Sequence, residues 1–175
     1  NQNIYVQQIG SGNPLQLTTD PADDFNPVWS PDGKHIASFR GPATAPTGLR
    51  NRELRLIPPL RGAERKLADI RSQDFAPWGT YLAWSPASNS LVVTDSPGDR
   101  KPDALFVISL ETGQKRQLTN PQPPTVADTS PAISPDGRSR ARCAMANPDG
   151  ARSIDPTSEA IFHHRRQGVR IVLDR

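Results

Sequence analysis

Hydrophobic residues in this chain occur in short runs of three or four, and polar, turn-forming residues separate the runs. Three of the runs are followed by a leucine, twice within a Leu-Thr pair. The runs are Ile4-Tyr5-Val6, Leu54-Arg55-Leu56-Ile57 and Leu105-Phe106-Val107-Ile108, and the leucines are Leu17, Leu67 and Leu118. Short runs rich in branched and aromatic residues predict β-strands. The leucines are 50 and 51 positions apart, so the chain repeats with a period near 50.

A second element recurs between these landmarks. Its copies are Pro27-Val28-Trp29-Ser30-Pro31-Asp32-Gly33, Leu82-Ala83-Trp84-Ser85-Pro86-Ala87-Ser88 and Pro131-Ala132-Ile133-Ser134-Pro135-Asp136-Gly137. Ser-Pro-Asp-Gly suits a tight turn, because proline presets φ, aspartate caps backbone donors and glycine accepts a positive φ. Strand-like segments follow the first two turns, at 34–39 and 91–94. Proline within a strand indicates an edge position, since it cannot donate to the ladder.

Two further hairpin turns are predicted at 10–13 and 111–114, so each unit holds about four strands. Four-stranded units of this length are typical of β-propeller blades. The Trp-Ser-Pro-Asp-Gly strings, in register with Ile4-Tyr5-Val6 and Leu17-Thr18, resemble the repeat of TolB-like β-propellers. The resemblance covers residues 1 to about 137. The second copy departs from it at Ala87-Ser88, and the third has Ile133 in place of tryptophan.

The repeats predict an all-β propeller fragment of about three four-stranded blades that form an incomplete ring. Two whole blades, at about 27–67 and 80–119, lie between two partial ones, while complete propellers have 4 to 8 blades. Residues 138–175 are expected to be a divergent basic tail, disordered or frame-shifted, because Ser139-Arg140-Ala141-Arg142-Cys143 shows no strand-like alternation. The predicted division is therefore 1–137 and 138–175.

Composition agrees with a turn-rich chain that has few helices. Of 175 residues, 19 are proline and 12 are glycine. No apolar run approaches the roughly 20 residues that a membrane span requires. The net charge of +3 belongs to the tail, where residues 138–175 hold eight arginines and four acidic residues. Arg140, Arg142, Arg152, Arg165, Arg166 and Arg170 could bind phosphate, but no aromatic residues interleave with them, and a solvated tail is favoured over nucleic-acid binding.

No catalytic, cofactor or metal site is predicted. His35 lies in a strand, and His163-His164 have no third ligand at a zinc-binding spacing. Gly10-Ser11-Gly12 is favoured as a hairpin turn over a phosphate loop. Asp20, Asp23 and Asp24 could hold a cation or line a channel mouth, although a solvated loop is favoured. Trp29 and Trp84 are expected to pack between blades and not to stack on a ligand.

The repeat therefore predicts a non-catalytic module that binds another protein, or a domain of its parent chain, for sensing or interaction. The resemblance implies bacterial proteins of this kind, among them periplasmic partners of envelope complexes and sensor halves of regulators or kinases. It favours a periplasmic or extracytoplasmic location on that ground alone. The alternative is the substrate-gating propeller of a prolyl-oligopeptidase-like serine peptidase, whose Gly-x-Ser-x-Gly nucleophile is absent from these 175 residues.

Overall fold

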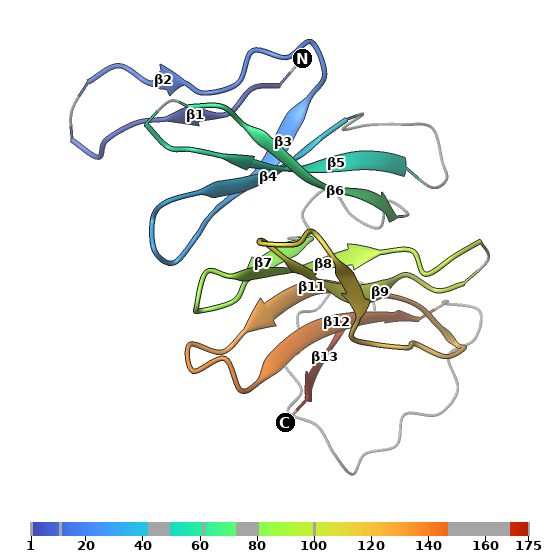
Figure 1. Ribbon diagram of the computed structural model, residues 1–175. Helices are drawn as coiled ribbons and strands as arrows, with labels where there is room; N and C mark the ends of the chain where they lie inside the picture. The colour runs from blue at the N-terminus through green and yellow to red at the C-terminus, as the bar shows by residue number, and fades with distance from the viewer. Residues whose placement is uncertain are drawn as a thin grey trace. The chain divides into compact units, whose positions relative to one another are not determined.

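The computed structural model describes residues 2–10, 12–41, 50–60, 62–72, 81–99, 101–146 and 169–174, and every regular element in them is a β-strand. The strands form antiparallel sheets of two to four members (Figure 1). Strands adjacent in sequence pair with one another, as the short hairpin turns require. The predicted all-β fold and its propeller-type sheets are confirmed. In the described part of the chain, no helix is long and apolar enough to span a membrane.

Four sheets follow one another along the chain. The half sheet contains β1 (Tyr5–Val6) and β2 (Leu15–Gln16). The first sheet contains β3 (Asp24–Trp29), β4 (Ile36–Arg40), β5 (Arg50–Ile57) and β6 (Arg65–Ser72). The second sheet contains β7 (Leu82–Trp84), β8 (Ser90–Asp95), β9 (Ala104–Ser109) and β10 (Lys115–Gln117). The third sheet contains β11 (Thr125–Ile133), β12 (Arg140–Ala146) and β13 (Val169–Asp174).

The sheets belong to two compact units. Residues 1–74 hold the half sheet and the first sheet, and residues 75–175 hold the second and third sheets. In the first unit, Val6 and Leu17 of the half sheet pack with Ile4 against Ile36 and Ile57 of the first sheet. Burial of one such side chain stabilises the fold by about 1.5–3 kcal/mol. Apolar contact between successive sheets therefore stabilises the first unit, together with the bond from the Asp24 amide to the Gln2 carbonyl.

All three Ser-Pro turns adopt the same backbone path. The amides of Gly33, Ser88 and Gly137 each donate to the carbonyl of the serine three residues earlier, at 2.8–2.9 Å. Their φ angles are +70°, +56° and +71°. In the first turn the carboxylate of Asp32 accepts hydrogen bonds from the Ser30 hydroxyl and the Lys34 amide. These bonds lower the pKa of that carboxyl below its ordinary 3.8. The predicted positive φ at the fourth turn position is confirmed, and the second turn accepts it without glycine.

The prolines inside the strands occupy edge positions, as predicted. β3 is the end strand of the first sheet and β11 of the third, and each carries a bulge beside its proline. Asn26 and Ser130, which precede Pro27 and Pro131, have φ of +52° and +50°. Because proline lacks an amide hydrogen, the bulged edge accommodates it without breaking a ladder bond.

A strand forms where the sequence had indicated none. β12 directly follows the third Ser-Pro turn and pairs with both β11 and β13. The expectation that Ser139-Arg140-Ala141-Arg142-Cys143 is not strand-like was therefore wrong. The reason is that β11 and the turn supply the ladder, so the backbone pairs although the side chains do not alternate. The division at 137 stays a prediction, and residues 147–168 lie outside the described residues.

Candidate binding site

One row of side chains occupies the same register in all three larger sheets. It runs across the first three strands of each sheet, because cross-strand partners point to the same face. The row is Trp29, Ile36 and Ile57 in the first sheet, and Trp84, Leu91 and Ile108 in the second. In the third sheet the partners are Ile133, Arg140 and Asp174. Among the side chains described, the third sheet therefore has Arg140 in place of an apolar residue and Ile133 in place of tryptophan.

A pocket of about 420 Å³ opens at this altered row. Val92, Val107 and Leu118 of the second sheet line one side, and Ile133 and Arg140 of the third sheet line the other. The second and third Ser-Pro turns and the residues that follow them form its rim: Ser85, Pro86, Ala87, Ser90, Asp136, Gly137, Arg138 and Ser139. Its volume is within the range of about 300–1,000 Å³ that is typical of small-molecule sites.

The first unit has an apolar cluster at the corresponding place. Val6 and Leu17 there match Val107 and Leu118, because Ile4 and Leu105 make the same backbone bonds. The amide of Ile4 donates to the hydroxyl of Thr18 at 2.9 Å, and that of Leu105 donates to Thr119 at the same distance. These bonds explain the Leu-Thr landmark, since the threonine hydroxyl satisfies a buried amide at the end of the hairpin.

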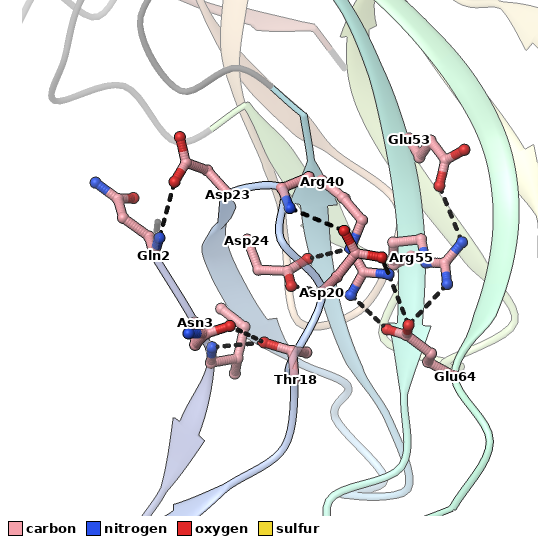
Figure 2. A network of polar contacts seen from close by, with 12 residues as sticks. Gln2, Asn3, Thr18, Asp20, Asp23, Asp24, Arg40, Glu53, Arg55 and Glu64 are labelled. Atoms are coloured by element: carbon pink, nitrogen blue, oxygen red, sulfur yellow. Dashed lines mark hydrogen bonds and ion pairs between the residues drawn. The ribbon is translucent and has the colours of Figure 1, made fainter.

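Asp20 and Asp24 lie around an internal cation, whereas Asp23 accepts from the Gln2 amide at 2.8 Å (Figure 2). Asp24 is fully buried, and its two carboxylate oxygens accept from Nε and Nη2 of Arg40, each at 2.9 Å. Asp20 and Glu64 bind Nη1 of the same guanidinium at 3.1 and 2.6 Å. Neither the solvated loop nor the bound cation describes Asp24, because Arg40 already neutralises it. No group of three metal-ligating side chains occurs among the residues that the structure describes.

Glu64 joins Arg40 to a second arginine. Arg55 binds Glu64 at 2.9 Å, and it also binds Glu53 at 2.9 Å (Figure 2). Partial burial would raise the pKa of Glu64, but the hydrogen bonds from Arg40 and Arg55 outweigh it and hold that pKa below its ordinary 4.5. Burial likewise opposes the charge of Arg40, and its bonds to Asp24 and Glu64 raise its pKa well above the ordinary value. The network is a structural ion cluster.

The second sheet has the same ion pair with its charges exchanged. Asp95 stands at the register position of Arg40, and Lys115 at that of Glu64. The ammonium of Lys115 lies 2.6 Å from Oδ2 of Asp95. The sequence repeat does not point to Arg40, Glu64, Asp95 or Lys115, because a repeat period identifies equivalent positions but not the partners of charged residues.

The two tryptophans of the repeat differ in burial. Trp84 is 7% exposed, which agrees with the expected packing, whereas Trp29 is 50% exposed beside a preceding sheet of only two strands, so its packing between blades stays a prediction. The half sheet has only two strands, and its side chains cover Ile36 and Ile57 while the Trp29 end of the row stays partly open.

The other predicted residues have simple positions. Gly10 and Gly12 lie in the β1–β2 hairpin with positive φ, which favours the turn over the phosphate loop. His35 bonds through its backbone to Ser30 across the first turn. Ser11, His163, His164, Arg152, Arg165 and Arg166 lie outside the described residues.

Comparison with solved structures identifies the fold. TolB from Acinetobacter baumannii matches 85% of this chain with a TM-score of 0.58 and 16% identity. A putative TolB from Agrobacterium tumefaciens matches 98% of it with a TM-score of 0.62 and 18% identity. The fold is that of a TolB-like β-propeller. This chain spans 36% and 52% of those two proteins, so it corresponds to part of a propeller.

Two enzymes also match this chain in fold. A prolyl endopeptidase structure matches 82% of the chain, which spans 23% of that protein, with a TM-score of 0.56 and 19% identity. An oligogalacturonate lyase in complex with manganese matches 78%, and the chain spans 39% of it, with a TM-score of 0.51 and 14% identity. No protein-family model and no characterised protein sequence matches the chain. Identities this low establish the fold alone.

Proposed function

We propose that this chain is a non-catalytic binding module that engages a segment of another protein, or of its own parent polypeptide, within a larger bacterial protein of the envelope or of a signalling system. The observation that carries the proposal is the open edge of the half sheet. β5 and β9 each pair on both sides, whereas β1, which corresponds to them, pairs only with β2 in the described part of the chain. An unpaired edge is a template for strand addition.

The backbone of Tyr5 is positioned for such an addition. Ile4 directs its amide to the hydroxyl of Thr18 and its carbonyl to the Leu17 amide, on the β2 side. Because backbone groups alternate along a strand, the amide and carbonyl of Tyr5 point to the open side. Tyr5 is 53% exposed, and Trp29 in the same unit is half exposed. Exposed aromatic side chains support the proposal that another segment covers this surface.

Hydrogen exchange tests this proposal. The Tyr5 amide should exchange fast in this chain and become protected in the full-length parent protein or its complex. Phe106 of β9 is the matched control, because it occupies the corresponding position and already pairs with Val93 of β8. The variant Tyr5→Pro lacks this amide hydrogen, so it should weaken the association with the added segment itself, while the Val6 amide, which lies in the β1–β2 ladder, should stay protected. An equally fast Tyr5 amide in the parent protein and in the complex would overturn the proposal.

The second candidate is the substrate gate of a prolyl-oligopeptidase-like serine peptidase. The fold shared with a prolyl endopeptidase favours it, and the hydrolase domain would then be a separate part of the parent. Hydrolysis of a proline-containing peptide by the parent protein would support this candidate. Binding of a protein segment at β1 without any such hydrolysis would support the binding module.

A further inference from the structure

The pocket of the second unit lies between two facing sheets. β11 of the third sheet lies against β7, β8 and β9 of the second. Val92, Val107 and Leu118 line the pocket from the second sheet, and Ile133 lines it from β11. Facing sheets pack about 10 Å apart, which limits the width of any space between them. The pocket is thus a narrow space with apolar side chains on both sides.

Ile133 distinguishes this pocket from the equivalent place in the other repeats. Its register position is occupied by Trp29 in the first sheet and by Trp84 in the second. Isoleucine is smaller than tryptophan, so the third sheet brings less apolar volume to this position. Trp84 is only 7% exposed, which shows that the fold can bury an indole here. The third sheet therefore lacks a ring that both other sheets carry.

The charged groups at the rim do not select a charged ligand. Oδ1 of Asp136 accepts from the Ser134 hydroxyl at 2.5 Å and from the Arg138 amide at 3.0 Å, so this carboxylate is committed to its own turn. Arg140 already interacts with another group of the chain. Arg138 is exposed, and exposed charges contribute little to an interaction in water. The apolar walls therefore decide what the pocket can hold.

We propose that this pocket binds a neutral aromatic ring about the size of an indole, packed between the valine and leucine side chains of the second sheet and Ile133 of the third. Apolar cavities in proteins take up such rings, and the binding energy grows with the apolar area that is covered. A free indole-like compound and the tryptophan side chain of a protein segment share this chemistry. The proposal is independent of strand addition at β1, which lies in the other unit.

NMR titration of the full chain with labelled valine and leucine methyl groups tests the proposal. Indole and N-acetyl-tryptophanamide are the probes, and a bound ring should shift the methyl signals of Val92, Val107 and Leu118. Val6 and Leu17 are the matched controls, because they hold the positions of Val107 and Leu118 in the first unit, where apolar contact already fills the space. Their signals should not shift.

A third probe separates an aromatic site from a merely apolar one. N-acetyl-leucinamide should bind about tenfold more weakly than N-acetyl-tryptophanamide, because its side chain covers less apolar area. Shifts caused by indole alone would identify a free ring compound as the ligand, and shifts caused by both ring probes would extend the site to a tryptophan side chain. Absence of shifts with either ring probe, or equal affinity for the leucine compound, would overturn the proposal.

Three variants locate the binding. Ile133→Trp supplies the ring from the chain itself, and it should weaken indole binding by at least about tenfold. Val107→Thr keeps the shape of the wall but adds a hydroxyl, and it should weaken binding by at least about threefold. Val126→Trp is the matched control, since Val126 is exposed on the same strand as Ile133 and should leave the affinity unchanged. Unchanged affinity in the folded Ile133→Trp and Val107→Thr proteins would overturn the assignment of the site.

Discussion

The second and third sheets pair their strands in the same register but place opposite kinds of residue in it. Trp84, Leu91 and Ile108 form a buried apolar row, whereas Ile133, Arg140 and Asp174 are the partners in the third sheet. The turns and ladder bonds set the register in both. Side chains then decide whether the space beside the row is filled or becomes a pocket. Backbone architecture and the lining of the pocket are thus specified by different residues.

The largest effect is expected when a charged residue is placed in the apolar row of the second sheet. Leu91→Arg should destabilise the chain by at least about 4 kcal/mol, because Leu91 is fully buried and an uncompensated guanidinium would be taken out of water. The urea midpoint measures the effect. Leu60→Arg is the control, since Leu60 is 85% exposed and should tolerate the charge within about 0.5 kcal/mol. A small effect at Leu91 would mean that this row is not a packed core.

The tryptophan at the start of the row differs in exposure between the first and second sheets. Trp84→Ala should cost about 3–5 kcal/mol, the range for emptying a buried aromatic site. Trp29→Ala should cost roughly half as much, because half of that side chain is already exposed. Chemical denaturation of the two variants side by side gives the ratio. Equal losses would show that exposure does not distinguish the two positions.

Acid should weaken the ion cluster around Glu64. The depressed pKa of Glu64 means that its contribution to stability is complete above the ordinary value of 4.5 and is lost as the pH falls through the lower folded-state value. The midpoint of the first unit should therefore fall steeply below about pH 4.5. Glu64→Gln should be less stable at pH 7 and flatter across that range. A Glu64→Gln variant with the parental acid profile would exclude Glu64 as the titrating group.

The smallest expected effect concerns the turns. Gly33→Ser gives the first turn the residue of the second, and it should cost about 0.5–1 kcal/mol, because φ there is +70°. A Cβ at this position meets no atom within 4 Å, so backbone conformation alone accounts for the loss. Thermal unfolding measures it. The reciprocal Ser88→Gly should change stability in the other direction, and a neutral Gly33→Ser would show that the turn tolerates any residue.

Sequence patterns predicted the architecture well for a physical reason. The Ser-Pro-Asp-Gly turn, the Leu-Thr pair and proline at a sheet edge each act through local backbone geometry. The roles of Gly33, Thr18 and Pro27 could therefore be predicted without knowing which distant residues they contact. β12 was missed because its pairing comes from the neighbouring strands and not from its own alternation. A strand inside a repeat depends on its position as well as on its composition.

The candidate sites were harder to predict, because they arise from residues distant in sequence. Asp24 was noted as an acid, but its partner Arg40 is 16 residues away and Glu64 is 24 beyond that arginine. Arg140 was attributed to a basic tail, and only the register shows that it replaces Ile36 and Leu91. An alignment of the three repeats on their Ser-Pro turns would have placed Arg140 at the position of Ile36 and Leu91, and so would have revealed the altered row.

The exchanged charges of Arg40–Glu64 and Asp95–Lys115 bear on how a chain of near-copies folds correctly. If β6 docked beside β8's sheet in place of β10, Glu64 would face Asp95, and two carboxylates would meet where an ion pair belongs. If β10 docked on the first sheet, Lys115 would face Arg40. Like charges penalise both mistakes. These charges thereby favour pairing of each sheet with its own fourth strand over pairing with the equivalent strand of another sheet.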